Sequence, residues 1–446
     1  MNIGKRDVWW GYISLLLVQG VNALLLPFVL IYLNDKELGL WYTFTSIYGL
    51  AILVDFGFQA TISRNISYIW SGAENIKASG YNYSNNNNNE INFDFLIKLL
   101  SSIKSIYYLM GGLILIILLT VGTSYIYLIT KNELNVSMVL FSWFFYLFAI
   151  VLNIMFSFWN SILKGIGAIK EYNKTLIIAK ISQIILSLLL LYLGYGIVGL
   201  TFAYLLSVII NRVTLSRFFY NYSMITKSLR GKIYAKVNKD IIKSLIPNTV
   251  KTGLTSISNY LVINFPILLA SYFLSLEISG EFGLVNQIIT LCLTLSNSYF
   301  NTYLAKFNYF RVKDNTRALI SLFKKSILIN YAINLGLFLG VVLVGQFLLN
   351  LFDTGKSLLP NSLIVLIMLY RFLYNNQTLF VSLLSTKNII PYYKSFLVSS
   401  IIIVSIQLIT LSIHASIISI IIPIIVIQLF YNNWYWPYHV IKDLRR

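Results

Sequence analysis

The sequence contains little that disulfide, metal or enzyme chemistry would use. Its single cysteine, Cys292, excludes a disulfide within the chain, and a lone cysteine in an apolar run is expected to be a small buried residue. The two histidines, His414 and His439, stand apart near the ends of apolar runs. The chain has no glycine-rich phosphate loop, no set of residues at metal-ligand spacing and no nucleophile beside a base. We therefore expect no metal site, no cofactor and no enzyme active site.

Acidic residues are also scarce. The chain has 15 Asp and Glu residues against 34 Lys and Arg residues, which gives a net charge of +19. A nucleic-acid-binding protein would gather this charge on one face or arm, whereas here it recurs in alternate gaps between apolar stretches. Basic residues beside a membrane meet anionic lipids. The charge therefore predicts contact with membrane lipids and no nucleic-acid partner.

Apolar sequence is what the chain has in abundance: 57% of its residues are hydrophobic. A helix needs about 20 apolar residues to cross the hydrocarbon core of a bilayer, and twelve stretches are long enough. We expect membrane spans over residues 8–33, 38–63, 106–129, 136–163, 175–195, 197–220, 247–274, 280–303, 326–351, 358–385, 392–414 and 416–438. The first stretch is too long for a cleaved signal peptide and ends without a cleavage site, so it counts as a span.

The basic residues fix an orientation for these spans. With both termini in the cytoplasm, 29 of the 34 Lys and Arg residues fall in or beside cytoplasmic segments, as the positive-inside rule requires; Arg212 and Arg371 are counted with their adjoining segments. The opposite side holds only Lys36, Lys131 and Lys356. Its connections are short and leave no room for an external catalytic domain, so the sequence favours a carrier over an enzyme.

The connections divide the chain into two halves of six spans each. A basic gap over residues 221–244 separates them, and residues 37–40 (ELGL) are echoed by residues 281–284 (EFGL). We predict an all-α polytopic membrane protein with about 12 transmembrane helices in two pseudo-symmetric six-helix lobes, 1–230 and 231–446, around a central cavity. Residues 65–104, with an asparagine run at 85–89, are expected to form a mobile cytoplasmic tip flanked by an interfacial helix near 93–100.

Arg371 is the deepest basic residue within a predicted span. A charged residue at the centre of a membrane helix costs about 2.5–3.5 kcal/mol, so each one is a functional hypothesis. Tyr374, Asn375 and Thr378 follow Arg371 on the same helix face. Arg371 can thus line a cavity, form an interhelical pair, or mark the inner end of a shorter span.

Asp55 is the only acidic residue buried in a predicted span. Helical spacing puts Tyr48, Asp55 and Gln59 on one face, while Arg64 points roughly the other way at the cytoplasmic end. Asp55 can serve as a proton or sodium site in a coupled carrier, or as the permanent ion-pair partner of a basic residue on another helix.

Polar stripes follow two shallower lysines. Lys180 heads a stripe with Gln183 and Ser187, and Lys251 lies in a second stripe. A third stripe in the eighth span contains Gln287 and Asn297. Such stripes can hold helices together or line a wet cavity, and their length favours the cavity. Cations among hydroxyl and amide groups suit an anion with a sugar-like body.

Residues 37–64 resemble the second-span signature of bacterial polysaccharide exporters of the O-antigen flippase type, in the multidrug/oligosaccharidyl-lipid/polysaccharide exporter superfamily. The matching elements are Leu38-Gly39, Asp55-Phe56-Gly57-Phe58 and Arg64, with a short connection at Leu163-Lys164-Gly165. The resemblance implies two six-helix lobes that alternately open a cavity to either side of the bacterial inner membrane. By motif position, the resemblance assigns family functional residues only to Asp55 and Arg64.

The resemblance also implies a cargo and a source of energy. The cargo would be an undecaprenyl-diphosphate-linked oligosaccharide, an O-antigen or capsule repeat unit, moved from the cytoplasmic to the periplasmic leaflet. An H⁺ or Na⁺ gradient would be coupled to transport, and other polysaccharide assembly proteins are possible partners. The candidate binding residues are Arg371, Lys251, Lys180, Arg64, Asn297 and Gln287, with Asp55 for ion coupling or an ion pair.

Two alternatives remain open from the sequence. A drug or small-molecule cation antiporter of the same superfamily would be expected to place more acidic residues in its cavity than the single Asp55. A membrane polysaccharide polymerase would need an external catalytic loop, which requires residues 65–104 to lie on the outer side.

Overall fold

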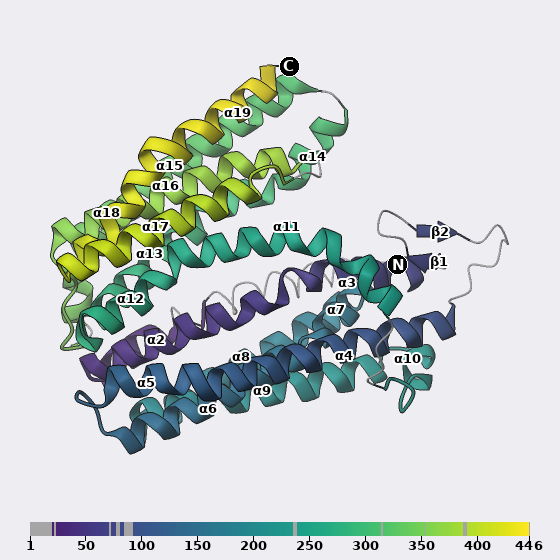
Figure 1. Cartoon of the computed structure of the whole chain (residues 1–446), viewed down its shortest axis with the longest axis horizontal. Coiled ribbons are helices and arrows are strands. Elements are labelled where there is room, and N and C mark those ends of the chain that lie inside the picture. The colour runs from purple at the N-terminus through teal and green to yellow at the C-terminus, as the bar shows by residue number, and fades with distance from the viewer. Residues whose placement is uncertain are drawn as a thin grey trace. The chain divides into compact units, whose positions relative to one another are not determined.

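The computed structural model describes residues 20–21, 24–70, 73–76, 81–83, 92–234, 239–313, 315–351, 353–386 and 390–445. Most of these residues are helical (Figure 1). The chain divides into two compact units: unit 1 comprises Met1–Leu33 and Ile47–Gly253, and unit 2 comprises Asn34–Ser46 and Leu254–Arg446. Two helices continue from one unit into the other, α2 (Asp35–Ile52) and α11 (Lys239–Ile263).

Unit 1 is a bundle of long helices with one small hairpin. Helix α9 packs against both α6 and α8, and α6 packs against α4. Besides the end of α2 and the start of α11, the elements of unit 1 are η1 (Leu53–Asp55), α3 (Phe58–Trp70), β1 (Ala73–Ile76), β2 (Tyr81–Tyr83), α4 (Phe93–Ile117), η2 (Leu118–Gly122), α5 (Thr123–Thr130), α6 (Val136–Met155), α7 (Phe158–Gly165), α8 (Ile169–Tyr192), α9 (Gly196–Tyr220) and α10 (Met224–Ser228).

Unit 2 is a second helical bundle. Helix α13 packs against α12, α15 and α16, and α16 also contacts α18 and α19. Besides the start of α2 and the end of α11, its elements are α12 (Phe265–Phe273), α13 (Leu276–Thr302), α14 (Leu304–Val312), α15 (Thr316–Leu351), α16 (Asn361–Ser385), α17 (Tyr393–Ile413), α18 (Ile417–Ile427), η3 (Gln428–Asn432) and α19 (Asn433–Arg445).

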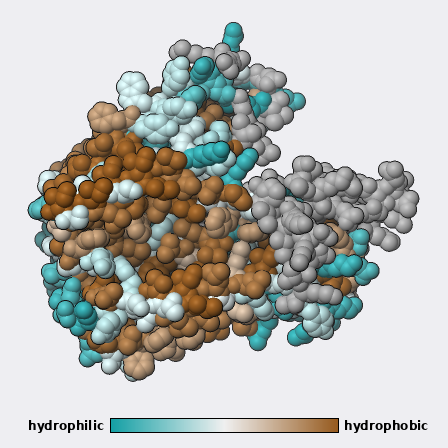
Figure 2. Space-filling model, viewed as in Figure 1, coloured by the Kyte–Doolittle hydropathy of each residue, from teal (hydrophilic) through white to brown (hydrophobic). Residues whose placement is uncertain are grey.

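Eleven described helical segments are long and apolar enough to cross a membrane, and they match the second to twelfth predicted spans. Of the first predicted span, 8–33, the structure describes residues 20–21 and 24–33. The prediction of an all-α polytopic membrane fold is confirmed, while the central cavity remains a prediction. Figure 2 shows apolar residues covering most of the described surface on this face, as expected for helices whose solvent is lipid.

The second span differs from the prediction of one continuous helix over 38–63. It breaks after η1, where Phe56 has φ 45° and Gly57 has φ 78°. Positive φ is natural for glycine and strained for phenylalanine. Helix α11 packs against this break, and its Thr252 Oγ1 donates to the Phe56 carbonyl at 3.3 Å. A Cβ on Gly253 would lie 2.0 Å from the Phe56 ring, so only glycine lets α11 approach this closely.

The polar segment 65–104 is more ordered than expected where it is described. Strands β1 and β2 pair antiparallel, with Ile76 opposite Tyr81, because backbone hydrogen bonds do not require a packed core. The interfacial helix expected near 93–100 is instead the start of α4, which runs without interruption to Ile117. The asparagine run 85–89 lies outside the described residues.

The echoed segments 37–40 and 281–284 are helix-packing surfaces within unit 2. A Cβ on Gly39 would lie 1.8 Å from the carbonyl oxygen of Leu276, and one on Gly283 would lie 2.4 Å from the Tyr42 ring. Small residues allow membrane helices to approach closely, and here they join α2 to the start of α13. Glu37 has a capping role, because its backbone N–H donates to Asn34 Oδ1 while the Asn34 N–H donates to Glu37 Oε2.

Candidate substrate-binding site

Arg371 lies in the middle of α16, inside the candidate span Asn361–Ser385. Because this helix continues to Ser385, the alternative in which a shorter span ends at Arg371 does not fit. The side chain is only 4% exposed, and its Nη2 donates to Thr290 Oγ1 on α13 at 2.8 Å. Its Nε and Nη1 are buried and form no well-aligned hydrogen bond with the described residues, although the Tyr370 hydroxyl lies beside the guanidinium.

The neighbours of Arg371 are neutral polar groups. Tyr370 donates to Asn286 on α13 at 2.7 Å, and Tyr374 donates to Asn259 on α11. The two described ion pairs of unit 2, Arg311 with Asp443 and Lys356 with Asp35, do not include Arg371. The positive charge of Arg371 is therefore surrounded by hydroxyl and amide dipoles rather than balanced by a carboxylate among these contacts.

An asparagine network continues from Arg371 toward the next helix turn. Asn375, one turn further along α16, accepts a hydrogen bond from Asn297 Nδ2 on α13 at 2.8 Å. Asn330 Nδ2 on α15 donates to Asn297 Oδ1 at 2.8 Å, and Asn334 Nδ2 donates to Asn330 Oδ1 at 2.9 Å. The predicted residues Arg371 and Asn297 thus belong to one polar cluster among α13, α15 and α16.

The predicted stripe on α13 is a half-buried face. Gln287 and Asn297 are half-buried, while Thr290, the partner of Arg371, is exposed. Gln287 lies one turn before Thr290 on the same helix. The buried guanidinium of Arg371 is therefore hydrogen-bonded to an exposed residue of α13.

Asp55 lies at the break in the second span, within unit 1. Its Oδ1 accepts a hydrogen bond from the Tyr107 hydroxyl on α4 at 2.5 Å, and its Oδ2 accepts one from the Gln59 N–H at 3.4 Å. The prediction that Tyr48, Asp55 and Gln59 share a continuous helix face is wrong, because the chain turns at Phe56 and Gly57. Neither of the two described ion pairs includes Asp55.

The other predicted cations of unit 1 lie on three separate helices. Lys180 on α8 donates to Gln183 Oε1 at 3.0 Å, which confirms that these two residues share a face. Gln183 and Ser187 are buried. Arg64 on α3 and Lys251 on α11 are both exposed. These contacts leave the binding roles of Lys180, Arg64 and Lys251 as predictions.

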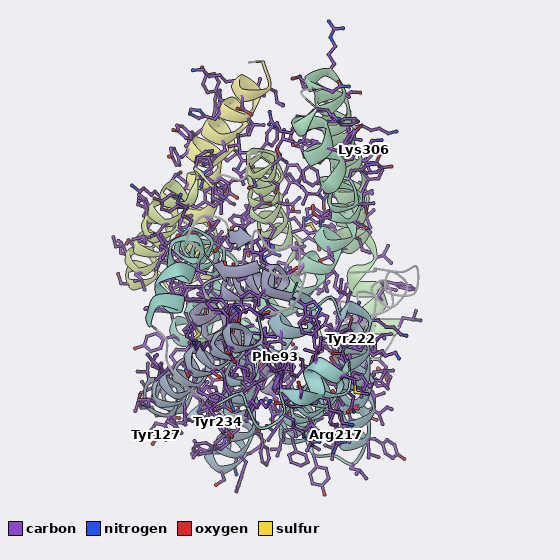
Figure 3. The ribbon with its side chains drawn as sticks, turned by 90° about the vertical axis from the view of Figure 1, so that its right-hand side faces the viewer. Phe93, Tyr127, Arg217, Tyr222, Tyr234 and Lys306 are labelled. Carbon is purple, nitrogen blue, oxygen red and sulfur yellow. The ribbon has the colours of Figure 1, made fainter. Side chains whose placement is uncertain are left out.

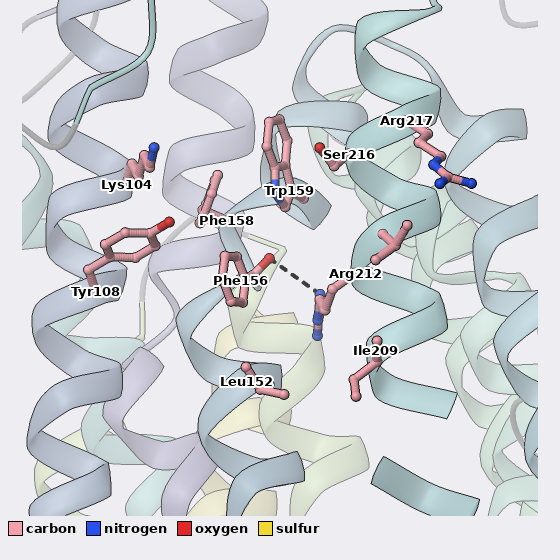
Figure 4. Close-up of a pocket in the computed structure, with 11 residues that line it drawn as sticks. Lys104, Tyr108, Leu152, Phe156, Phe158, Trp159, Ile209, Arg212, Ser216 and Arg217 are labelled. Atoms are coloured by element: carbon pink, nitrogen blue, oxygen red, sulfur yellow. Dashed lines mark hydrogen bonds between the residues drawn. The ribbon is translucent and has the colours of Figure 1, made fainter. Parts of the chain in front are cut away.

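Arg212 is a half-buried cation that the sequence reasoning did not single out. Its charge was counted with the cytoplasmic segment, yet it lies two turns inside α9. Its Nη1 donates to the Phe156 carbonyl at 3.5 Å (Figure 4). The same Nη1 donates to Asn160 Oδ1 at 3.2 Å, and Nη2 donates to Asn153 Oδ1. The sequence does contain a signal for this position, because Arg212 lies two turns before the end of the apolar run.

The fold is similar to that of solved transporters of the MOP superfamily. The chain is 16% identical, with a TM-score of 0.73 over 99% of both chains, to a multidrug resistance MATE family transporter of this superfamily in an inward-facing conformation. It is 15% identical, with a TM-score of 0.60 over 97% of both chains, to the MATE multidrug transporter DinF-BH in complex with R6G.

A third similar structure is a MOP superfamily transporter from Pyrococcus furiosus, described as having a binding pocket of reverse polarity that suggests a different function. The identity is 15% and the TM-score 0.57, over 99% of this chain and 97% of that one. A sequence model described as "Polysaccharide biosynthesis protein" matches residues 5–305. The chain belongs to this polysaccharide biosynthesis protein family. No curated protein matches the sequence.

Proposed function

We propose that this protein is a flippase that moves an undecaprenyl-diphosphate-linked oligosaccharide from the cytoplasmic to the periplasmic leaflet of the bacterial inner membrane. The cargo is an O-antigen or capsule repeat unit, and both chain termini lie in the cytoplasm. The observation that carries the proposal is the buried guanidinium of Arg371, which has neutral hydrogen-bond partners and two nitrogen atoms without a well-aligned acceptor. Membership of a polysaccharide biosynthesis family supports a glycan cargo.

The charge of Arg371 is suited to a diphosphate. A buried cation in a membrane protein is costly, and it persists where something negative or strongly polar stabilises it. Guanidinium groups bind phosphate oxygens through charge-assisted hydrogen bonds. The surrounding asparagine side chains offer donors and acceptors for sugar hydroxyls, Asn297 and Asn375 among them. In this proposal Gln287, Lys180, Lys251 and Arg64 add further polar contacts during transport.

Desolvation is the main obstacle to this reaction. Moving a negative diphosphate out of an inside-negative cell is favoured by about 2.3 kcal/mol per charge for each 100 mV. The cost lies in removing water from the diphosphate and the glycan. Fixed donors replace that water, while the isoprenoid tail stays in lipid. Alternating access then exposes the cargo outward, and an H⁺ or Na⁺ gradient acting through Asp55 biases the return step.

The runner-up function is antiport of a cationic drug or small molecule. MATE transporters share the fold, but a similar fold does not assign a cargo. The polar cluster of unit 2 is built around a cation, which would repel a cationic cargo. A polymerase role is the more distant alternative.

The proposal is tested by deleting the gene and following the lipid-linked repeat unit. We expect loss of surface polymer, with complete repeat units trapped on the cytoplasmic leaflet. Repeat units that reach the outer leaflet but stay unpolymerised would contradict a flippase and indicate a polymerase. Unchanged surface polymer with lost drug resistance would indicate an antiporter.

A further inference from the structure

Unit 1 has a pocket that none of the predicted site residues occupy. It measures about 430 Å³ and lies among α4, α6, α7 and α9 (Figure 4). Three cations, Lys104, Arg212 and Arg217, line it together with the aromatic rings of Tyr108 and Trp159. No acidic residue is among the described residues that line it. We refer to it as the α4–α9 pocket.

The α4–α9 pocket opens on an apolar, exposed surface of unit 1. Ile209 and Val213, which line it from α9, are exposed. Leu109 on α4 follows Tyr108 directly and is 68% exposed, and Phe148 on α6 lies one turn before the lining residue Leu152 and is also exposed. Large apolar side chains left exposed on a membrane helix face acyl chains. The cations of the pocket are therefore reached from the lipid.

The pocket lies near the cytoplasmic ends of its helices, at the level of the lipid headgroups. Arg217 lies in the last turn of α9, which ends at Tyr220, and Lys104 Nζ donates to the Ile233 carbonyl beyond α10 at 3.2 Å. Figure 3 looks onto the end of unit 1 that carries Phe93, Arg217, Tyr222 and Tyr234. The positive-inside rule assigns this basic segment to the cytoplasm.

None of the three cations of the pocket takes part in the two ion pairs found among the described residues. Arg212 donates only to a carbonyl and two asparagine oxygens, and its Nε is buried without an acceptor among the described residues. The ammonium group of Lys104 contacts a carbonyl and lies 5.5 Å from the centre of the Tyr108 ring. The pocket thus combines uncompensated cations with an apolar body, which is the chemistry that a phosphate attached to a hydrocarbon chain requires.

We propose that the α4–α9 pocket binds the phosphate headgroup of an anionic phospholipid from the cytoplasmic leaflet. Lys104 and Arg217 contact the phosphate at the rim of the pocket. Arg212, which lies further from the end of α9, attracts the phosphate electrostatically. An acyl chain packs along Ile209 and Val213. Basic pockets between membrane helices on the cytoplasmic side recognise anionic headgroups in this way. The site belongs to unit 1 alone and does not depend on the cargo.

The test is lipid binding to the full-length protein, measured by native mass spectrometry in detergent. The lipids are phosphatidylglycerol, cardiolipin and zwitterionic phosphatidylcholine, each with and without millimolar inorganic phosphate. The pocket variant is Lys104→Gln with Arg217→Gln. Its matched control is Lys313→Gln with Arg317→Gln, which removes the same two charges from exposed positions. Circular dichroism confirms that both variants are folded.

We expect the anionic lipids to bind more tightly than phosphatidylcholine and to resist inorganic phosphate. One cation near a membrane surface contributes about fivefold in affinity, so the pocket variant should lose about 25-fold and the control should match the wild type. Equal losses in the two variants would overturn the site. Binding of inorganic phosphate with no preference for anionic lipid would overturn the lipid assignment and indicate a soluble phosphate compound.

Discussion

Arg212 in unit 1 and Arg371 in unit 2 are both arginines inside membrane helices, but they differ in how well their donors are satisfied. Arg212 is half-buried and forms three hydrogen bonds within its bundle, which leave only its Nε without an acceptor among the described residues. Arg371 is more deeply buried, forms one such bond, to Thr290, and has two nitrogen atoms without a well-aligned acceptor. An arginine with most of its donors satisfied can hold helices together, whereas one with most of its donors unsatisfied is costly unless a ligand accepts hydrogen bonds from them.

Replacement of Arg371 is expected to have the largest effect on transport. Arg371→Gln removes the charge that binds the diphosphate, and a hydrogen bond to a charged group contributes about 1.5–3 kcal/mol, which corresponds to a loss of export of roughly 10- to 100-fold. The loss of export is measured as the amount of surface polymer in a deletion strain complemented with each variant. Arg371→Lys should retain part of the activity, and the exposed Arg317→Gln should retain all of it. Full export by Arg371→Gln at equal protein level would remove Arg371 from the mechanism.

The close glycine contact between α2 and α13 is expected to contribute to the stability of unit 2. A methyl group on Gly39 would meet the Leu276 carbonyl at 1.8 Å, so Gly39→Ala should destabilise the protein by about 3 kcal/mol. Gly112→Ala on α4 is the matched control, because no atom lies within 4 Å of its added methyl group. Thermal unfolding in detergent compares the two, and equal stability would show that the close packing of α2 is dispensable.

Arg212→Gln should affect stability rather than transport. The substitution leaves Asn153 and Asn160 without their cationic donor, at an expected cost of about 2 kcal/mol in the free energy of unfolding. Export per folded molecule should stay normal, as judged by surface polymer divided by the amount of membrane-inserted protein. A folded Arg212→Gln protein that fails to export would contradict the assignment of a structural role to Arg212 and a transport role to Arg371.

The smallest effect is expected for Asp55→Asn. Asparagine can still accept the Tyr107 hydrogen bond, so the break in the second span should persist. If Asp55 couples transport to an ion gradient, the variant should lose only the acceleration that an imposed H⁺ or Na⁺ gradient gives to the wild type in proteoliposomes. Equal acceleration of the wild type and Asp55→Asn would return Asp55 to a structural role.

The sequence was sufficient for the membrane fold and for part of the unit 2 cluster. Apolar length alone located the eleven spans that the structure describes, and depth within a span singled out Arg371. Asn297 was found because polar residues at helical spacing mark a face. The hydrogen bond from Asn297 to Asn375, one turn beyond Arg371, joins positions 78 residues apart, so no local pattern reveals it.

Other features could not be read from local sequence. The break at Phe56 lies inside a stretch whose overall apolar length indicates one continuous helix, and the Gly253 contact from α11 that accompanies it is distant in sequence. The position of Arg212 inside the bundle was not recognised, because a basic residue near the end of a span ordinarily belongs to the adjoining loop. The echo of residues 37–40 in 281–284 suggested a repeat, while the structure uses both segments for close helix packing.

The central claim is tested most directly by reconstitution of the purified protein in liposomes with a labelled isoprenoid-diphosphate-linked oligosaccharide. Access of an added glycan-modifying enzyme reports which leaflet holds the cargo. The account predicts protein-dependent movement between leaflets that the wild type supports, that Arg371→Gln loses and that Arg317→Gln retains. Movement that is independent of the protein, or equal for all three proteins, would contradict it.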